Sequence, residues 1–162
     1  MTDLEAIRET IAEGLSKSAG IPVIRSNTTG TLPKYPFISY TIRQLLDDRK
    51  GTWGEYDDGK DRIPTTQIWS VTVQSDDFAE CMFYAQKAYL FFARLGLQDL
   101  KDAGITVEEV GAMTNRDTLL TVGYEYRYGF DVNVGFMSET ESKTNRVGYI
   151  EEADVERVEG QE

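Results

Sequence analysis

The most constraining feature of this sequence is a run of apolar and aromatic residues spaced strictly two apart. The run comprises Leu120, Val122, Tyr124, Tyr126, Tyr128, Phe130, Val132, Val134 and Phe136, and the positions between them are polar or glycine. Because side chains alternate between the two faces of a strand, this pattern predicts a β-strand with one buried and one polar face. Fully extended, residues 120–136 would span roughly 50 Å, whereas a typical strand has about 5 to 6 residues. We therefore expect a bend at Gly129 or an extension towards a partner.

Two further stretches alternate in the same way. Residues Phe37 to Leu46 and Gln67 to Gln74 each carry apolar side chains at every second position. The segment Asp47 to Arg62 between them is polar, charged and rich in glycine, which indicates a long exposed loop. The simplest arrangement is a β-hairpin with this loop at its tip.

Helical periodicity is found in two places. Thr2 with Glu5 has the spacing of a capping box, and a narrow apolar stripe then runs to Leu15 before Gly20 ends the helix. Asp77 caps a second helix, from Phe78 to Leu95, whose apolar residues occupy nearly its whole circumference. After Gly96 we expect a short turn over 97–103, followed by the last sheet segment from Ile105.

The two sides of the second helix need different covers. We expect six residues to meet the sheet: Phe78, Cys81, Met82, Ala85, Tyr89 and Phe92. Phe83, Leu90 and Phe91 lie elsewhere on the circumference and need a second cover, which is either the first helix or another subunit.

These elements predict one α+β domain over residues 1–136. Its sheet is expected to be mainly antiparallel, with about four to five strands and two helices packed on one face, since only one face of each strand is apolar. Residues 137–162 contain eight acidic and three basic residues and form an acidic C-terminal extension. We expect this extension to be partly ordered or to add a strand to a neighbour.

Composition excludes much of catalytic chemistry. The 162 residues include no histidine, so an imidazole base and the usual zinc ligands are absent, and the single Cys81 is interpreted as a buried small hydrophobe. A net charge of -11 disfavours binding to nucleic acid by phosphate neutralisation. No apolar stretch reaches the length of about 18 residues that a membrane helix needs. We expect no enzyme activity, no cofactor and no membrane contact.

Two apparent motifs fail on physical grounds. Residues 54–61 have the spacing of a phosphate-binding loop, but Asp61 replaces the magnesium-binding hydroxyl and acidic residues would face the phosphates. We interpret this stretch as a solvated glycine-rich hairpin. The acidic pairs, such as Asp76-Asp77, lack the spacing of a calcium loop, and this pair has the simpler task of capping a helix.

Several stretches resemble the small phage tail terminator proteins, also called neck terminator or tail-completion proteins. The resemblance is carried by residues 36–40, 67–75, 124–132 and 147–151, namely Pro-Phe-Ile-Ser-Tyr, Gln-Ile-Trp-Ser-Val-Thr-Val-Gln-Ser, Tyr-Glu-Tyr-Arg-Tyr-Gly-Phe-Asp-Val and Val-Gly-Tyr-Ile-Glu. It implies a structural virion protein that forms a ring, usually of six subunits, and has no catalytic site. Such a ring ends tail-tube growth and joins the tail to the head or neck, while DNA passes through its lumen without specific binding. The implied partners are the tail tube protein and a neck or head-completion protein. The implied location is the virion, after synthesis in the host cytoplasm.

Two sets of interface residues follow. Exposed aromatic residues in a charged loop are typical of contact surfaces, so the expected contacts with tail or neck partners are Arg49, Lys50, Trp53, Tyr56, Lys60 and Arg62. The apolar helix and the long strand supply the expected lateral contacts of the ring: Phe83, Leu90, Phe91, Tyr126, Tyr128 and Phe130.

The sequence also leaves two other functions open. The same fold without ring assembly suits a small-ligand or regulatory binding module, and a hydrolase that uses only Asp and Lys is a weaker possibility. Mass in solution discriminates between them, since a ring assembles and the other two stay small.

Overall fold

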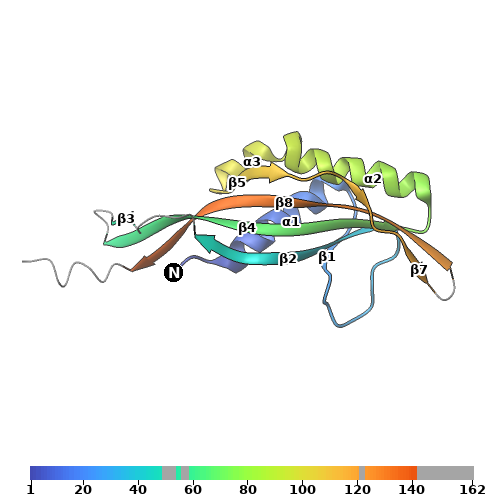
Figure 1. Cartoon of the computed structure of the whole chain (residues 1–162), viewed down its shortest axis with the longest axis horizontal. Coiled ribbons are helices and arrows are strands. Elements are labelled where there is room, and N and C mark those ends of the chain that lie inside the picture. Colours follow the sequence, from blue (N-terminus) through green and yellow to red (C-terminus); the bar gives the residue numbers. More distant parts are fainter. Residues whose placement is uncertain (49–53, 56–58, 121–122, 142–162) are drawn as a thin grey trace, which may run out of the picture.

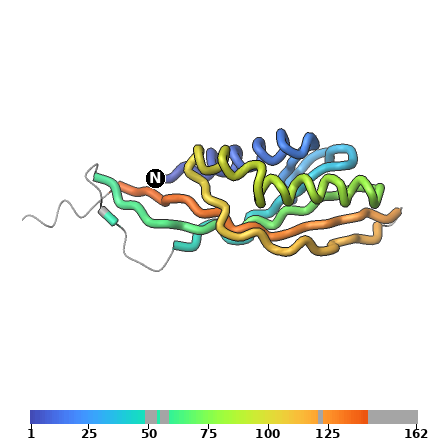
Figure 2. Tube along the Cα trace, turned by 90° about the horizontal axis from the view of Figure 1, so that it is seen from above, coloured from blue at the N-terminus to red at the C-terminus, as the bar shows by residue number. Residues whose placement is uncertain are grey.

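The computed structural model describes residues 1–48, 54–55, 59–120 and 123–141. The helical elements are α1 (Leu4–Ala19), α2 (Phe78–Leu90), the π-helix η1 (Phe91–Leu95) and α3 (Leu97–Asp102). The strands are β1 (Val23–Arg25), β2 (Phe37–Asp48), β3 (Gly54–Glu55), β4 (Lys60–Ser75), β5 (Thr106–Val110), β6 (Thr114–Asn115), β7 (Thr118–Leu120) and β8 (Gly123–Glu141). The helices form a layer on one face of the sheet (Figures 1 and 2).

The sheet follows the order β1-β2-β4-β8-β5, and β3 pairs with β4 while β6 and β7 pair with β8. The pairing of β1 with β2 is parallel and the other described pairings are antiparallel. The α+β class and the mainly antiparallel sheet are therefore confirmed. The strand number is larger than expected because three short strands lie along β4 and β8. The expected turn over 97–103 is helix α3.

The hairpin predicted between residues 37 and 74 is present as β2 and β4. Their register runs from Phe37 opposite Gln74 to Asp48 opposite Thr65, with irregularities after Ile42 and Gln44. At its far end the short strand β3 pairs Gly54 with Arg62. The phosphate-loop lookalike thus leads into an antiparallel strand pairing, whereas a phosphate loop leads from a strand into a helix.

The long alternating run departs from its prediction in two ways. Leu120 belongs to β7 and pairs with Gly123, so the run crosses from one strand to the next in a hairpin. Strand β8 then pairs with β4 in one unbroken register as far as Glu141, five residues beyond Phe136. At Gly129, where a bend was expected, the pairing with β4 has no irregularity, and this glycine lies opposite Thr72.

The start of α1 also differs from the capping-box prediction. The N-cap is Asp3, whose Oδ1 accepts the backbone N–H of Ala6 at 3.0 Å. The hydroxyl of Thr2 instead accepts the backbone N–H of Glu139 at 2.7 Å. Thr2 therefore links the N-terminus to the far end of β8, while Asp3 caps the helix.

The core lies between the sheet and the α1–α2 layer. Trp69 is fully buried and stacks on Tyr40 at 4.6 Å between ring centroids, and its indole N–H donates to Gln67 Oε1 at 2.6 Å. Alternate positions of three strands supply the rest of the sheet side of the core: Ile38, Val71, Val73, Phe130, Val132 and Val134. Period-two patterning placed these residues correctly because each strand buries one face against the helices.

Candidate assembly surfaces

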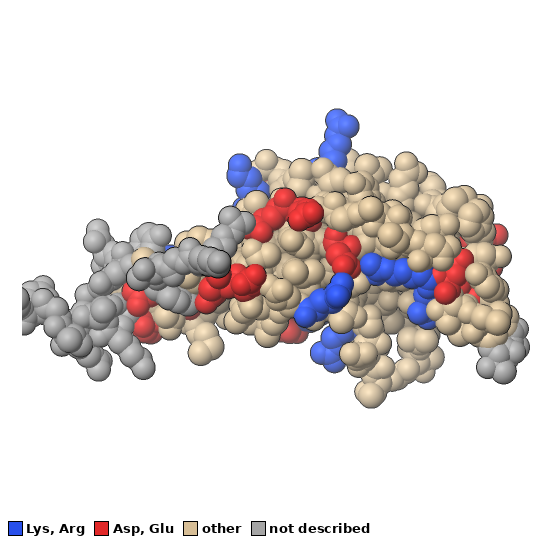
Figure 3. All heavy atoms as spheres, viewed as in Figure 1, with Lys and Arg blue, Asp and Glu red and all other residues tan. Residues whose placement is uncertain are grey.

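Helix α2 presents exposed apolar side chains on the surface of the chain. Phe83 is 52 % exposed and Met82 is 45 % exposed, and Phe78 and Leu90 are exposed as well. Phe83 packs against its helix neighbours Tyr84 and Lys87, and the ammonium of Lys87 lies 5.0 Å from the centre of the Phe83 ring. Figure 3 shows that the visible surface over α2 is mostly uncharged. Exposed apolar side chains gathered in this way are typical of surfaces that contact other proteins.

A groove of about 470 Å³ runs beside this surface, and we call it the α2 groove. It is lined by Met82, Ala85, Gln86, Tyr89, Met113 and Tyr128. Met82, Gln86 and Tyr89 follow one another at helical spacing, so a single side of α2 forms one wall. Tyr128 of β8 and Met113 complete it. Methionine and tyrosine side chains make such a wall adaptable and largely apolar.

The expected lateral residues fall into two groups. Phe83 and Leu90 are exposed, as an interface requires, and Tyr126 and Tyr128 are half-buried. Phe91 and Phe130 are buried at 2 % and 0 % exposure within one chain, so they are core residues, unavailable for lateral contact. Of the two covers considered for Phe91, the structure uses helix α1.

Glycines explain why Phe91 turns inwards. A Cβ atom on Gly96 would lie 2.3 Å from the Phe91 ring, and one on Gly14 of α1 would lie 3.1 Å from it. The ring thus occupies space that two missing side chains leave free. The π-helical turn η1, which begins at Phe91, brings the ring next to Gly96. Helical periodicity alone did not show this, because both the turn and the glycine on α1 are needed.

Several residues expected to meet the sheet do so only in part. Cys81, Ala85 and Phe92 are buried, but Phe78 and Met82 remain 45 % exposed at the open side of α2. Phe78 still contacts the sheet, with its ring centroid 5.5 Å from that of Tyr126. The part of α2 near its N-terminus is therefore less covered than its apolar sequence predicted.

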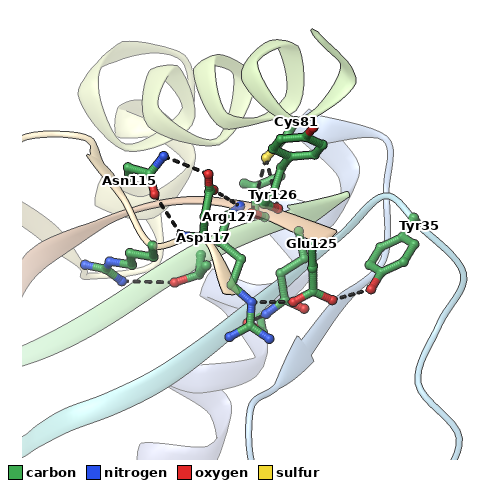
Figure 4. Close-up of polar contacts among 12 residues, drawn as sticks. Tyr35, Cys81, Asn115, Asp117, Glu125, Tyr126 and Arg127 are labelled. Atoms are coloured by element: carbon green, nitrogen blue, oxygen red, sulfur yellow. Dashed lines mark hydrogen bonds and ion pairs between the residues drawn. The ribbon is translucent and has the colours of Figure 1, made fainter. Parts of the chain in front are cut away.

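The prediction that Cys81 is a buried small hydrophobe is confirmed. Its thiol lies 3.5 Å from the carbonyl oxygen of Val73 and 3.4 Å from that of Tyr126 (Figure 4). Burial raises the pKa of the thiol to about 11, so the group stays protonated at neutral pH.

The predicted partner-facing residues are only partly described. Arg49, Lys50, Trp53 and Tyr56 lie outside the described residues. Lys60 and Arg62 are in β4, where both donate to the carboxylate of Glu139 at 2.7 and 2.8 Å. These two hydrogen bonds hold the pKa of Glu139 below its usual value. Lys60 and Arg62 therefore brace the far end of the sheet.

The face of the sheet opposite the helices carries a charge network that the sequence did not reveal. Arg116 donates to Ser70 at 2.7 Å, to Thr72 at 2.9 Å and to Asp131 at 3.2 Å. Arg43 donates to the other oxygen of Asp131 at 2.8 Å. Burial alone would raise the pKa of Asp131, but hydrogen bonds from Ser70 and Arg116 outweigh it and lower that pKa.

A missing side chain makes room for Arg116. A Cβ atom on Gly129 would lie 2.7 Å from the guanidinium of Arg116 and 2.6 Å from the carbonyl oxygen of Val71. From the sequence, this glycine was expected to mark a bend within a long strand. Because Gly129 has no side chain, the guanidinium of Arg116 can approach the backbone of β8 closely. Only the position of Arg116 in the folded chain reveals this role.

A second network fastens the 26–36 connection to β8 (Figure 4). The Tyr35 hydroxyl donates to one carboxylate oxygen of Glu125 and Arg127 donates to the other. The hydrogen bond to Glu125 raises the pKa of Tyr35 to about 12. The backbone N–H of Arg127 donates to Asp117 at 2.7 Å and lowers the pKa of that carboxyl group. The charged groups of these two networks are thus paired within the chain.

Neither a metal cluster nor a membrane-spanning helix is found in the described parts of the chain. No group of three or more Cys, Asp or Glu residues there has the arrangement of a metal site. Among the helices described, none has the length and apolar character that crossing a bilayer requires.

Two comparisons find a similarity to known proteins. A chain in a structure described as the virion of a native gene transfer agent particle is 11 % identical, with 83 % of this chain and 94 % of that chain covered and a TM-score of 0.42. No curated protein matches the sequence. A family model described as phage neck terminator protein matches residues 5–161, which is nearly the whole chain. The chain therefore belongs to the phage neck terminator family, and it is a structural protein of the virion neck.

Proposed function

We propose that this protein assembles into a closed ring, expected to contain six copies, that ends growth of the tail tube and joins the tail to the head or neck. The observation that carries the proposal is the exposed apolar surface of α2 in a chain that matches the neck terminator family over residues 5–161. A monomer would leave Phe83, Met82 and Leu90 in water. Burying them against a neighbour stabilises an assembly by roughly 25 cal/mol for each Å² of apolar area removed from water.

The polar face of the sheet fits the passage of DNA through such a ring. Arg43 and Arg116 share Asp131, and Arg127 is paired with Glu125, so each cation of these networks has an anionic partner within the chain. A surface of paired charges on a protein of net charge -11 does not hold phosphates tightly. We assign contact with the tail tube protein and the neck or head-completion protein to residues 47–62, with Trp53 and Tyr56 as anchors.

Mass in solution tests the proposal. Light scattering of the purified protein, alone and with tail tubes, should give a closed oligomer, and electron micrographs should show rings at tube ends. Replacing the exposed Phe83 with Asp should lower the mass towards that of a monomer, because an unpaired charge would be buried at the contact.

The matched control is Ala6→Asp, which also places a carboxylate at an exposed helix position but lies in the first turn of α1, away from α2. Its mass should equal that of the wild type, and circular dichroism should show both variants folded. A wild type that stays monomeric at high concentration, even with tail tubes present, would refute ring assembly.

A further inference from the structure

The α2 groove is an open and mostly apolar depression in the surface of the chain. Its volume is about 470 Å³, which is large enough for a few side chains of a partner segment. The lining consists mainly of apolar and aromatic side chains, and Gln86 contributes an amide group. A site of this kind fits a short peptide that carries one aromatic and one aliphatic side chain.

The sequence beyond β8 contains such a peptide. Val147, Tyr149 and Ile150 are the first apolar residues after Met137, and polar or glycine residues fill the positions before and between them. In an extended conformation Val147 and Tyr149 project from the same face, about 7 Å apart. The family model matches residues 5–161, so this segment lies within the part of the chain that resembles the family.

Chain length decides which copy supplies the segment. The near end of the α2 groove is at Tyr89, which contacts Phe130 of β8 at 5.5 Å between ring centroids. From Phe130, β8 continues away from the groove to Glu141, a distance of about 36 Å at about 3.3 Å per residue. Tyr149 is eight residues beyond Glu141, so a fully extended chain would bring it back by at most about 29 Å. The segment therefore falls short of the groove of its own chain. Figure 1 shows α2 and the end of β8 towards opposite ends of the molecule.

We propose that residues 147–150 of one copy dock in the α2 groove of the next copy, with Tyr149 as the anchor. This inference rests on the proposed ring and names a contact that closes it. Donor and acceptor are different surfaces of the same chain, so the contact is head-to-tail, and repetition of a head-to-tail contact produces a ring when the rotation closes.

Cross-linking between two single-site variants tests this directly. Gln86→Cys places a thiol on the rim of the groove and Glu151→Cys places one directly after the donor segment, so the anchor Tyr149 is kept. Cys81 stays in both proteins, because it is fully buried and its raised pKa keeps it unreactive. The two variants are mixed, allowed to exchange subunits and treated with a short bismaleimide. We expect a covalent dimer containing one copy of each variant, identified by mass spectrometry of the linked peptides.

The matched control replaces Gln86→Cys with Gln98→Cys, at an exposed glutamine on α3 outside the groove, and should give no linked peptide with Glu151→Cys. A protein with both Gln86→Cys and Glu151→Cys that links only within a single chain would overturn the inference in favour of docking on its own groove. Rings that form normally without any link between positions 86 and 151 would overturn the inference and leave ring assembly intact. A monomeric wild type would instead be a failure of the proposed function.

A second measurement does not depend on cross-linking. Tyr149→Asp should lower the mass of the assembly, and Tyr149→Phe should keep it, since the ring fills the same space without its hydroxyl. An unchanged mass for Tyr149→Asp would contradict the role of Tyr149 as anchor.

Discussion

The α2 surface and the polar face of the sheet lie on opposite sides of the same strands. They differ in whether their side chains have partners within the chain. On the polar face, Asp131 receives hydrogen bonds from Arg43 and Arg116, and Glu125 receives them from Tyr35 and Arg127. On α2, Phe83 is more than half exposed. Paired charges gain little by binding a partner, whereas exposed apolar area gains by leaving water. The difference supports the proposal that α2 drives assembly while the polar face of the sheet stays open.

The largest effect on the free energy of unfolding should come from replacing the buried Phe91, and the exposed Phe83 provides the comparison. Phe91→Ala would leave a cavity between Gly14 and Gly96 and should lower the free energy of unfolding by about 3–5 kcal/mol. Phe83→Ala removes an exposed ring and should lower it by less than about 1 kcal/mol. Urea denaturation at low protein concentration measures both, and equal losses would mean that Phe83 is also a core residue.

A smaller effect is expected on the polar face, from adding one methyl group to β8. Gly129→Ala would push a Cβ atom against Val71 and Arg116 and should cost about 1–3 kcal/mol of unfolding free energy. Gly123→Ala is the control in the same strand, because a Cβ atom there has no neighbour within 4 Å. Thermal unfolding should therefore separate the two variants. Equal melting temperatures would show that the close approach of Arg116 is not maintained in solution.

The smallest effect concerns the charge of Asp131. Its pKa in the folded protein lies below the ordinary value of 3.8, so ionisation stabilises the fold above that pH, and this contribution is lost as the pH falls through the folded-state pKa. Asp131→Asn should reduce the unfolding free energy by at most about 1 kcal/mol at pH 7, as is usual for exposed ion pairs. The difference from the wild type should vanish in acid.

Asp99→Asn, on the exposed surface of α3, serves as the control for this titration. A difference between wild type and Asp131→Asn that grew on acidification would reverse the sign and contradict the assigned pKa direction.

Local patterns predicted the elements well where one short stretch contains the whole signal. The alternation around Ile38 and Val71 placed both strands and their buried faces, and Asp77 marked the start of α2 correctly, accepting the backbone N–H of Glu80 at 2.8 Å. Patterns failed where two neighbouring residues can take the same structural role. Thr2 and Asp3 are both capable caps, and the sequence spacing favoured Thr2, although its hydroxyl is engaged by Glu139 from the other end of the chain.

The candidate site was predictable only in outline. The exposed Phe83 and Leu90 were identified because α2 has more apolar residues than one sheet can cover. The α2 groove was not identified, since its wall combines Met82 with Met113 and Tyr128, which come from three separate segments. The Asp131 network was missed for the same reason, because Arg43, Arg116 and Asp131 meet only after the strands have paired.

By itself, the sequence determined the class of the fold and which face of each long strand is buried, because side-chain alternation is a property of neighbouring residues. It also determined that helix α2 has more apolar residues than one sheet can cover. Tertiary structure alone decided that Phe91 turns inwards while Phe83 stays outside, that Leu120 and Gly123 flank a hairpin, and that Gly129 admits Arg116. Those outcomes depend on space left free by residues far away in the chain, and a local pattern carries no information about that space.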